Sequence, residues 1–204
     1  MKSKLAKKFM DEGCVLIKDF LDPTTTMLFS RYMENCVNQN IYIDRDAQDK
    51  DKDNHSSRFS KYGDPLTESL LVEKLEKVQE IVGVDLYPTY SYSRIYLISD
   101  SLSAHVDRPS CEYSVTVNVA KVGHSWPIYM KNKEKEESMF LLNPGDAIIY
   151  KGCDMLHWRP PLNQCGAELN AQFMLHYVDK NGVNKEYKWD KRPSLGLSSE
   201  YRGG

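Results

Sequence analysis

The sequence predicts an α+β fold in which helices from the first part of the chain support a jelly roll or sandwich of β-strands. Two observations lead to this prediction. The first 83 of the 204 residues contain amphipathic segments with helix-capping residues. Residues 84–180 instead contain six or more short runs rich in β-branched and aromatic residues, with no helix between them. Hydrophobic residues make up 41% of the chain, enough for one large domain, and no composition break divides it.

Two segments of the mainly helical part, residues 1–83, have the pattern of helices. Residues 20–40 contain an Asp-Pro-Thr sequence suited to a helix start, after which apolar residues recur at helical spacing. Residues 64–83 repeat this arrangement more clearly, with Asp-Pro at the start, a stripe of leucines and valines, and a glycine at the end. Between them, residues 43–63 are charged and poor in apolar side chains, which indicates an exposed loop.

The second part has the texture of strands separated by Gly, Pro, Asn or Asp. The charged residues 131–138 are expected to form a hairpin tip, and the Gly- and Ser-rich residues 190–204 a loose tail. We expect strands within residues 87–99, 113–120, 126–132, 138–143, 146–152 and 171–179.

Charge and cysteine content exclude several classes of protein. The net charge of −2 offers no general attraction for nucleic acid, and no apolar run is long enough to span a membrane. The first twenty residues lack the sustained apolar stretch of a signal peptide, so we expect a cytoplasmic protein. Five cysteines without a CxxC pair fit reduced thiols better than disulfides or a zinc knuckle.

A candidate metal site begins with His105 and Asp107, which flank one residue shortly before the strand run at 113–120. Alternate residues of an extended chain point the same way, so both side chains can ligate one ion. His157 follows on a late strand, and antiparallel strands can bring it close. Two histidines and one carboxylate bind Fe(II) on one face and leave three positions open. The alternative interpretation is a polar turn that Asp107 caps.

Three stretches of the chain resemble a known family: "YPTYSYSRIYLISDSLSAHVDRPSCEYSVTVNV", "NPGDAIIYKGCDMLHWR" and "QFMLHYV". They resemble the Fe(II)/2-oxoglutarate-dependent oxygenases, in particular the prolyl 4-hydroxylase-like branch. The resemblance covers residues 84–180 and implies a double-stranded β-helix (jelly roll, cupin-like) with N-terminal supporting helices. It also implies that His105, Asp107 and His157 are the iron ligands and that Tyr96 forms a hydrogen bond with 2-oxoglutarate.

Further contacts with 2-oxoglutarate follow from the same resemblance. The family places small polar residues on the strand after the His-x-Asp pair, where Thr116 and Asn118 share one face. It usually has a basic residue about ten positions after the distal histidine, but this chain has Asn170 and Gln172 in that neighbourhood. For His176, on the same strand, we expect hydrogen bonds within the core.

A dicarboxylate in a partly buried pocket needs a cation, because it is costly to bury without one. Arg159 is the first candidate for this role, since it lies two positions after His157 and a guanidinium suits a carboxylate. Arg94 and Arg108 are the alternatives. We therefore expect Tyr96 and one of these arginines to hold the C5 carboxylate of 2-oxoglutarate.

The resemblance implies an enzyme that hydroxylates an unactivated C–H bond and releases succinate and CO2. The implied substrate is a prolyl or other amino-acid residue of a peptide, or an amino-acid-like small molecule. Fe(II), 2-oxoglutarate and O2 are the implied cofactor and cosubstrates, with ascorbate as an optional addition. Two alternatives remain: a non-catalytic cupin-like binding module, and a metal-dependent enzyme of the same fold with other chemistry. The sequence predicts no oligomeric state.

Overall fold

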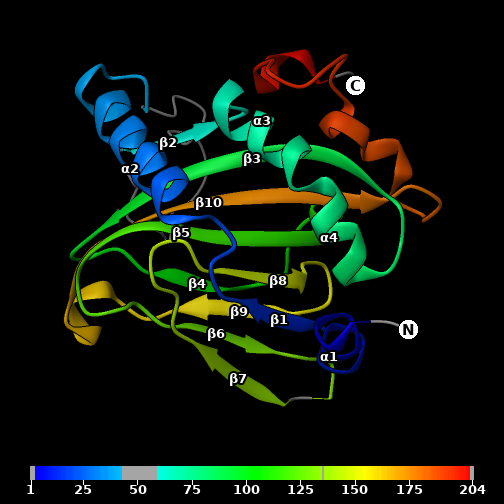
Figure 1. Cartoon of the computed structure of the whole chain (residues 1–204), viewed down its shortest axis with the longest axis horizontal. Helices are drawn as coiled ribbons and strands as arrows, with labels where there is room; N and C mark the ends of the chain where they lie inside the picture. The colour runs from blue at the N-terminus through cyan, green and yellow to red at the C-terminus, as the bar shows by residue number, and fades with distance from the viewer. Residues whose placement is uncertain (1–2, 43–58, 135, 203–204) are drawn as a thin grey trace.

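Two antiparallel β-sheets face each other in the computed structural model, which describes residues 3–42, 59–134 and 136–202 (Figure 1). The larger sheet has the strand order β1-β8-β5-β10-β3-β2, and the smaller has β4-β9-β6-β7. The strands are β1 (Cys14–Ile17), β2 (Phe59–Tyr62), β3 (Leu86–Leu97), β4 (Leu102–His105), β5 (Tyr113–Gly123), β6 (Ile128–Lys131), β7 (Glu137–Phe140), β8 (Ala147–Lys151), β9 (Leu156–Arg159) and β10 (Ala167–Asp179).

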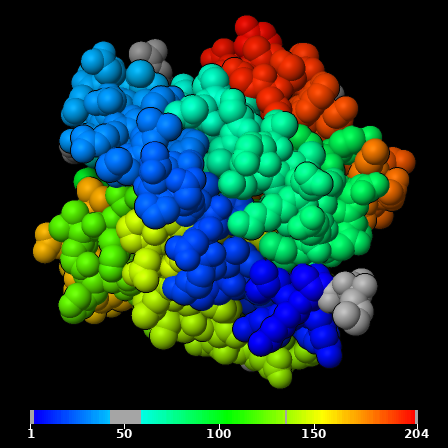
Figure 2. Space-filling model, viewed as in Figure 1, coloured from blue at the N-terminus to red at the C-terminus, as the bar shows by residue number. Residues whose placement is uncertain are grey.

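Helices cover the outer face of the larger sheet (Figure 1), as the sequence predicts. Phe29 of α2 meets Phe173 of β10 edge to face, with ring centroids 4.8 Å apart. Figure 2 shows the N-terminal segment and helices side by side over this face. The helices are α1 (Lys4–Glu12), α2 (Pro23–Asn38), α3 (Pro65–Glu73) and α4 (Leu75–Val82), with short 3-10 turns η2 (Pro109–Cys111), η3 (Leu162–Cys165), η4 (Lys185–Lys191) and η5 (Ser199–Tyr201). Among the described residues, no helix is both long and apolar enough to cross a bilayer.

The capping residues that predict helix starts act as expected. The Asp22 side chain accepts a hydrogen bond from the Thr25 backbone, and Asp64 caps α3 in the same way, each with proline in the first turn. The predicted single helix at 64–83 is instead two helices that meet at Lys74. This break lets α3 lie on β3 and β10 while α4 packs against α1.

Three strands lie where the sequence gives no periodic signal. β1, β2 and β4 have four residues each, too few for an alternating pattern to stand out, and they form because a neighbouring strand supplies hydrogen bonds. β2 lies at the end of the predicted loop 43–63, whose remaining part, residues 43–58, lies outside the described residues.

The tail is held more firmly than its composition predicts. Asp190 and Arg192 are buried, and the guanidinium of Arg192 pairs with Glu68 of α3 at 2.6 Å. Asp190 and Arg192 therefore attach the tail to the domain, although the chain there is rich in Gly and Ser and most of the residues after Arg192 are exposed.

Alternation along the two central strands separates a core from an inner polar layer. On β5, the valines at 115, 117 and 119 join the core beneath the helices, whereas Ser114, Thr116 and Asn118 belong to the opposite face. On β10, Phe173 and Leu175 face the helices, and the alternate residues Gln172 and His176 lie on the other side. The inner faces of β5 and β10 therefore carry mainly polar side chains, whereas Ile148 of β8 packs with Ile128 and Met130 of β6 in an apolar cluster between the sheets.

Candidate metal centre and cosubstrate cavity

The three predicted metal ligands meet between β4 and β9. His105 and His157 are directly paired in the antiparallel register of these strands, and Asp107 follows two residues after the end of β4. Asp107 Oδ1 lies 3.6 Å from His105 Nε2 and 3.5 Å from His157 Nε2. One donor atom from each residue lies within 4.8 Å of the others, a spacing suited to a single metal ion.

Backbone carbonyls orient both imidazoles. His105 Nδ1 lies 2.8 Å from the carbonyl oxygen of Ser103, and His157 Nδ1 lies 2.9 Å from that of Met155. A carbonyl can only accept, so each Nδ1 carries the proton. Each Nε2 then presents its lone pair toward Asp107, which is the tautomer of a metal-ligating histidine.

Asp107 is fixed through its other oxygen and its backbone. Ser114 Oγ donates to Asp107 Oδ2 at 2.8 Å and lies 2.9 Å from His176 Nδ1, so the core hydrogen bond expected for His176 is present. The Asp107 N–H donates to the carbonyl of Gly152 at 2.9 Å. A Cβ at Gly152 would lie 2.5 Å from Asp107 Oδ2, so glycine is required at that position.

The charge states suit a metal site at neutral pH. Burial alone would raise the pKa of Asp107, but the adjacent imidazole of His105, the nearby His176 and His157, and the Ser114 hydroxyl together lower it to about 2. Burial lowers the pKa of His157 despite the adjacent carboxylate. An ionised carboxylate beside a neutral imidazole is the donor state that a divalent cation requires.

A cavity of about 150 Å³ lies beside the three ligands. The side chain of His157 is 3% exposed and that of His105 is 41% exposed, so the centre is reached from the His105 side. Three of the predicted cosubstrate contacts line this cavity: Tyr96, Thr116 and Gln172.

The other two predicted contacts, Asn118 and Arg159, are buried but are not among the lining residues of the cavity. Asn118 Nδ2 donates to the Leu142 carbonyl at 2.8 Å. Arg159 donates to the carbonyl of Trp126 at 2.7 Å and to Gln172 Oε1 at 3.1 Å. Arg159 thus contacts Gln172, which lines the cavity, whereas the sequence predicts that Arg159 itself contacts the cosubstrate.

Arg94 lines the cavity itself. It pairs with Gln172 across β3 and β10, and its guanidinium carbon lies 4.4 Å from the ring centroid of Tyr96. Arg108, the remaining alternative, is occupied by two hydrogen bonds to Asp190 at 2.8 Å.

Two arginines lie at the cavity, Arg94 in its lining and Arg159 behind Gln172. Within the described residues, neither Arg94 nor Arg159 has an ion-pair partner, and each has a buried Nε without a hydrogen-bond partner. Burial lowers the pKa of Arg159 to about 10, which still leaves it charged at neutral pH. A buried guanidinium is stable only when an anion or good hydrogen bonds compensate it. These residues therefore fit a bound carboxylate next to a divalent cation.

Three tyrosines at the cavity were not singled out for function by the sequence. Tyr150 lies edge-on to His157 with ring centroids 5.0 Å apart, and Tyr90 and Tyr92 contribute to the same wall. Tyr150 is paired with Ser114 across β8 and β5, and paired residues point to the same face of the sheet. The sequence alone does not give this pairing, so it could not indicate that Tyr150 faces the cavity.

A second group of ligand-type atoms, from Asp107, Cys111 and His176, also lies within 4.8 Å. The Ser114 hydroxyl bonds to both Asp107 and His176 in this group. Burial raises the pKa of Cys111 to about 12, so the thiol stays protonated. The group is therefore a hydrogen-bonded support for Asp107 rather than a second metal site.

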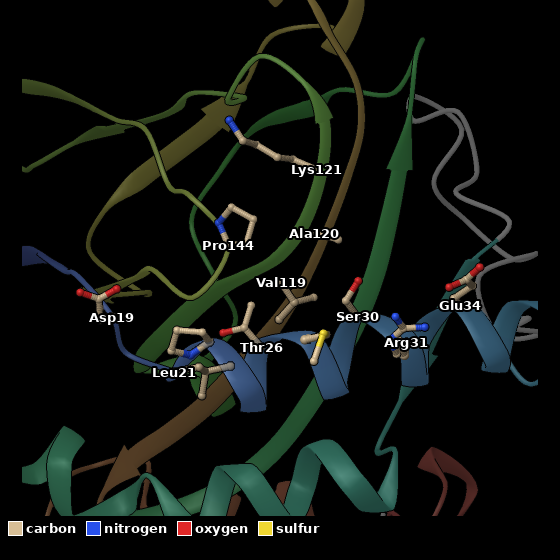
Figure 3. Close-up of a pocket in the computed structure, with 12 residues that line it drawn as sticks. Asp19, Leu21, Thr26, Ser30, Arg31, Glu34, Val119, Ala120, Lys121 and Pro144 are labelled. Atoms are coloured by element: carbon tan, nitrogen blue, oxygen red, sulfur yellow. The ribbon is translucent and has the colours of Figure 1, made fainter.

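A larger depression of about 570 Å³ lies on the outer surface between α2 and β5 (Figure 3). Its rim carries two acidic and two basic residues whose charges offset one another: Asp19, Glu34, Arg31 and Lys121. None of these belongs to a metal-binding group among the described residues. We therefore place the functional site at the His-Asp-His centre.

No protein-family model matches the chain, and no curated protein matches it in sequence. Solved structures do match it. A 2OG-Fe(II) oxygenase family protein from Burkholderia pseudomallei superposes with a TM-score of 0.66 at 12% identity, over 91% of this chain and 93% of that one. A Pseudomonas putida prolyl-4-hydroxylase gives 0.68 at 10% identity, over 89% and 100%.

EctD from S. alaskensis, solved with 2-oxoglutarate and 5-hydroxyectoine, matches with a TM-score of 0.67 at 14% identity, over 97% of this chain and 87% of that chain. These structural matches extend over nearly the whole of this chain and of each matched chain. They confirm the predicted fold class: the chain has the double-stranded β-helix fold of these oxygenase structures, with supporting N-terminal helices.

Proposed function

We propose that the chain is an Fe(II)- and 2-oxoglutarate-dependent dioxygenase. One observation carries the proposal: two histidine nitrogens and one carboxylate oxygen converge beside a cavity that contains unpaired arginine charge. The donor set matches the chemistry of a non-haem Fe(II) site, because it combines two neutral imidazoles with one carboxylate on a single face. His105, Asp107 and His157 would hold the ion.

Bound Fe(II) would supply a redox-active centre with open positions at which O2 is reduced: one oxygen atom goes to the C–H bond as hydroxyl and the other to 2-oxoglutarate, which becomes succinate and CO2. The residues of the chain orient the ligands of the ion. Asp107 offers Oδ1 to the ion because Ser114 holds Oδ2. The backbone carbonyls at 103 and 155 keep both imidazoles in the ligating tautomer.

Arg94 is the residue that we assign to the C5 carboxylate of 2-oxoglutarate, in place of Arg159. Arg94 lines the cavity, and its buried Nε has no hydrogen-bond partner. Arg159 would act indirectly, because its hydrogen bond to Gln172 Oε1 orients the amide group, of which one N–H donates to Met174 Sδ and the other is left for the carboxylate. Tyr96 and Thr116 would add hydroxyl donors from the same cavity wall.

The prime substrate would approach from the exposed side of His105. The cavity of about 150 Å³ is below the roughly 300–1,000 Å³ of typical ligand pockets, so it suits the cosubstrate alone. Tyr90 and Tyr150 close the inner wall and keep bulk water from the reacting centre. We propose a prolyl or other amino-acid group as the hydroxylation target, supported by structural likeness to a prolyl-4-hydroxylase and to EctD with 5-hydroxyectoine.

The five cysteines are free thiols, which supports a reducing, cytoplasmic location. Three of them are buried, and the other two lie apart from any partner sulfur in the described residues.

An anaerobic titration with Fe(II) and then 2-oxoglutarate tests the proposal. We expect a weak visible charge-transfer band in the wild-type protein and none in Asp107→Ala. Succinate release is then measured against proline-containing peptides and free amino acids. Absence of metal binding by the wild-type protein would indicate a non-catalytic module. Metal binding without 2-oxoglutarate consumption would indicate other chemistry on the same fold.

A further inference from the structure

The segment after β10 turns back toward the metal centre. In η4, Trp189, Asp190 and Lys191 have φ angles of 55°, 57° and 62°, a left-handed run that side chains disfavour. The run directs the Asp190 carboxylate inward, where it is 1% exposed. η4 contacts β3 and η2, and Figure 1 shows the last part of the chain beside β2 and α3. Such backbone persists where other contacts hold it, which raises the question of what Asp190 does.

The buried carboxylate of Asp190 accepts hydrogen bonds from several side chains. Arg108 donates from both terminal nitrogens, to Oδ1 and Oδ2, at 2.8 Å each. The Tyr62 hydroxyl donates to Oδ2 at 2.6 Å, and Arg202 Nε lies 2.9 Å from the same oxygen. A two-pronged arginine–carboxylate pair fixes direction as well as distance.

Arg108 directly follows the metal ligand Asp107 in the chain. Both residues lie between the end of β4 and the start of η2, where the backbone belongs to neither element. A segment of this kind depends on individual anchors for its position. The hydrogen bond from the Asp107 backbone to Gly152 is one such anchor, the bond from the Cys111 N–H to the Arg108 carbonyl at 2.8 Å is another, and the Arg108–Asp190 pair adds a side-chain anchor.

A second route leads from the same pair to the Asp107 carboxylate. The guanidinium of Arg108 lies 4.6 Å from the ring centroid of Tyr90, and that ring lies 4.6 Å from the ring of His176. His176 bonds to Ser114, which donates to Asp107 Oδ2. Arg108 is thus connected to the Asp107 backbone directly along the chain, and to the Asp107 carboxylate through Tyr90, His176 and Ser114.

We propose that Asp190 is a positioning residue for the metal centre: through Arg108 it holds Asp107 in the ligating orientation, so the segment after β10 completes the site. The inference rests on the proposed function, because it assumes that Asp107 binds a metal. It adds a supporting residue 83 positions beyond Asp107, from a part of the chain outside the jelly-roll strands.

Metal affinity of the intact protein tests this. Co(II) is titrated anaerobically into wild type, Asp190→Asn, Arg108→Gln and the double variant, and the dissociation constant and visible Co(II) spectrum are measured. Loss of a supporting partner around a metal site typically lowers affinity 10–100-fold. We expect about a tenfold rise in the dissociation constant for each single variant, with an altered spectrum. The double variant should resemble either single one, because both remove the same pair.

Arg202→Gln is the matched control, since it removes a different partner of the same carboxylate and leaves the pair with Arg108 intact. Its metal affinity should stay within twofold of wild type, while its melting temperature falls as for Asp190→Asn. Equal affinity in Asp190→Asn and wild type overturns the inference, and so does an equal loss in Arg202→Gln. If Asp190→Asn does not fold, Arg108→Gln decides in the same way. A wild-type protein that binds no Co(II) contradicts the proposed function instead.

Discussion

His105 and His157 face each other across the antiparallel pair of β4 and β9, and their ring centroids lie 4.3 Å apart. The pairing register decides this approach, because a shift by one residue would turn one imidazole to the opposite face of the sheet. The geometry of the metal centre therefore depends on the register of two four-residue strands, and the residues around the centre fix the orientation of the ligands further. The following predictions test those constraints.

Ser114→Ala should weaken metal binding about 10- to 100-fold, because Asp107 Oδ2 loses its hydroxyl donor and the carboxylate can rotate. The measurement is an anaerobic Co(II) titration. Ser110→Ala is the control: Ser110 is also buried, but its hydroxyl lies against Cys111 Sγ rather than Asp107. Equal affinities in the two variants would show that Ser114 does not orient the ligand.

Gly152→Ala should cost both stability and metal binding. The new Cβ would lie 2.1 Å from the backbone carbonyl oxygen of Cys111 and 2.5 Å from Asp107 Oδ2, and overpacking of this kind costs about 1–3 kcal/mol or more. Urea unfolding and a metal titration measure the two effects. In Gly182→Ala the new Cβ would lie 2.8 Å from the Asp179 Cβ, away from the metal ligands, so we expect lower stability with unchanged metal affinity. Retained metal binding in Gly152→Ala would refute the steric argument.

Arg94→Gln should raise the dissociation constant of 2-oxoglutarate about 10- to 100-fold, the loss expected for a hydrogen bond to a charged group. Metal affinity should change little, because Arg94 does not touch the ligands. Binding is followed by the fluorescence of the metal-loaded protein. Arg159→Gln should have the smaller effect, since Arg159 reaches the cavity through Gln172. The opposite ranking would return the carboxylate contact to Arg159.

Protonation of His176 should contribute to acid unfolding. Burial lowers the pKa of His176 to about 4 in the folded chain, whereas an unfolded histidine titrates near 6.5. The folded state therefore resists protonation, so this stability is fully present above about pH 6.5 and is lost as the pH falls toward 4. The difference corresponds to about 3 kcal/mol. Urea unfolding of His176→Gln across this range should show a shallower pH dependence than wild type, whereas exposed His124→Gln should match wild type.

The sequence was most informative where chemistry depends on local spacing. The His-x-Asp pair and the distal histidine follow from alternation and from the family resemblance. Alternation also places Thr116 and Asn118 on one face of their strand, and of these two Thr116 lines the cavity. The helix starts at Asp22 and Asp64 follow from capping chemistry.

Contacts that depend on non-local pairing could not be predicted in the same way. The position of Arg159 two residues after His157 places it on the inner face, but its depth in the barrel depends on Trp126, from the loop before β6, and on Gln172 of β10. Arg94 lies beside Gln172 only because β3 pairs with β10. The anchoring of Asp190 involves Arg108, a partner 82 residues away, and no local pattern indicates such a contact.

The three ligands come together only when β4 and β9 have paired, and these strands are separated by about fifty residues of chain. The unfolded chain cannot present them as a set, so a bound metal selects the folded form and shifts the folding equilibrium by mass action. Each tenfold rise in free metal above its dissociation constant adds about 1.4 kcal/mol to the free energy of unfolding. Thermal denaturation at graded metal concentrations would thus read out occupancy of the site without any substrate.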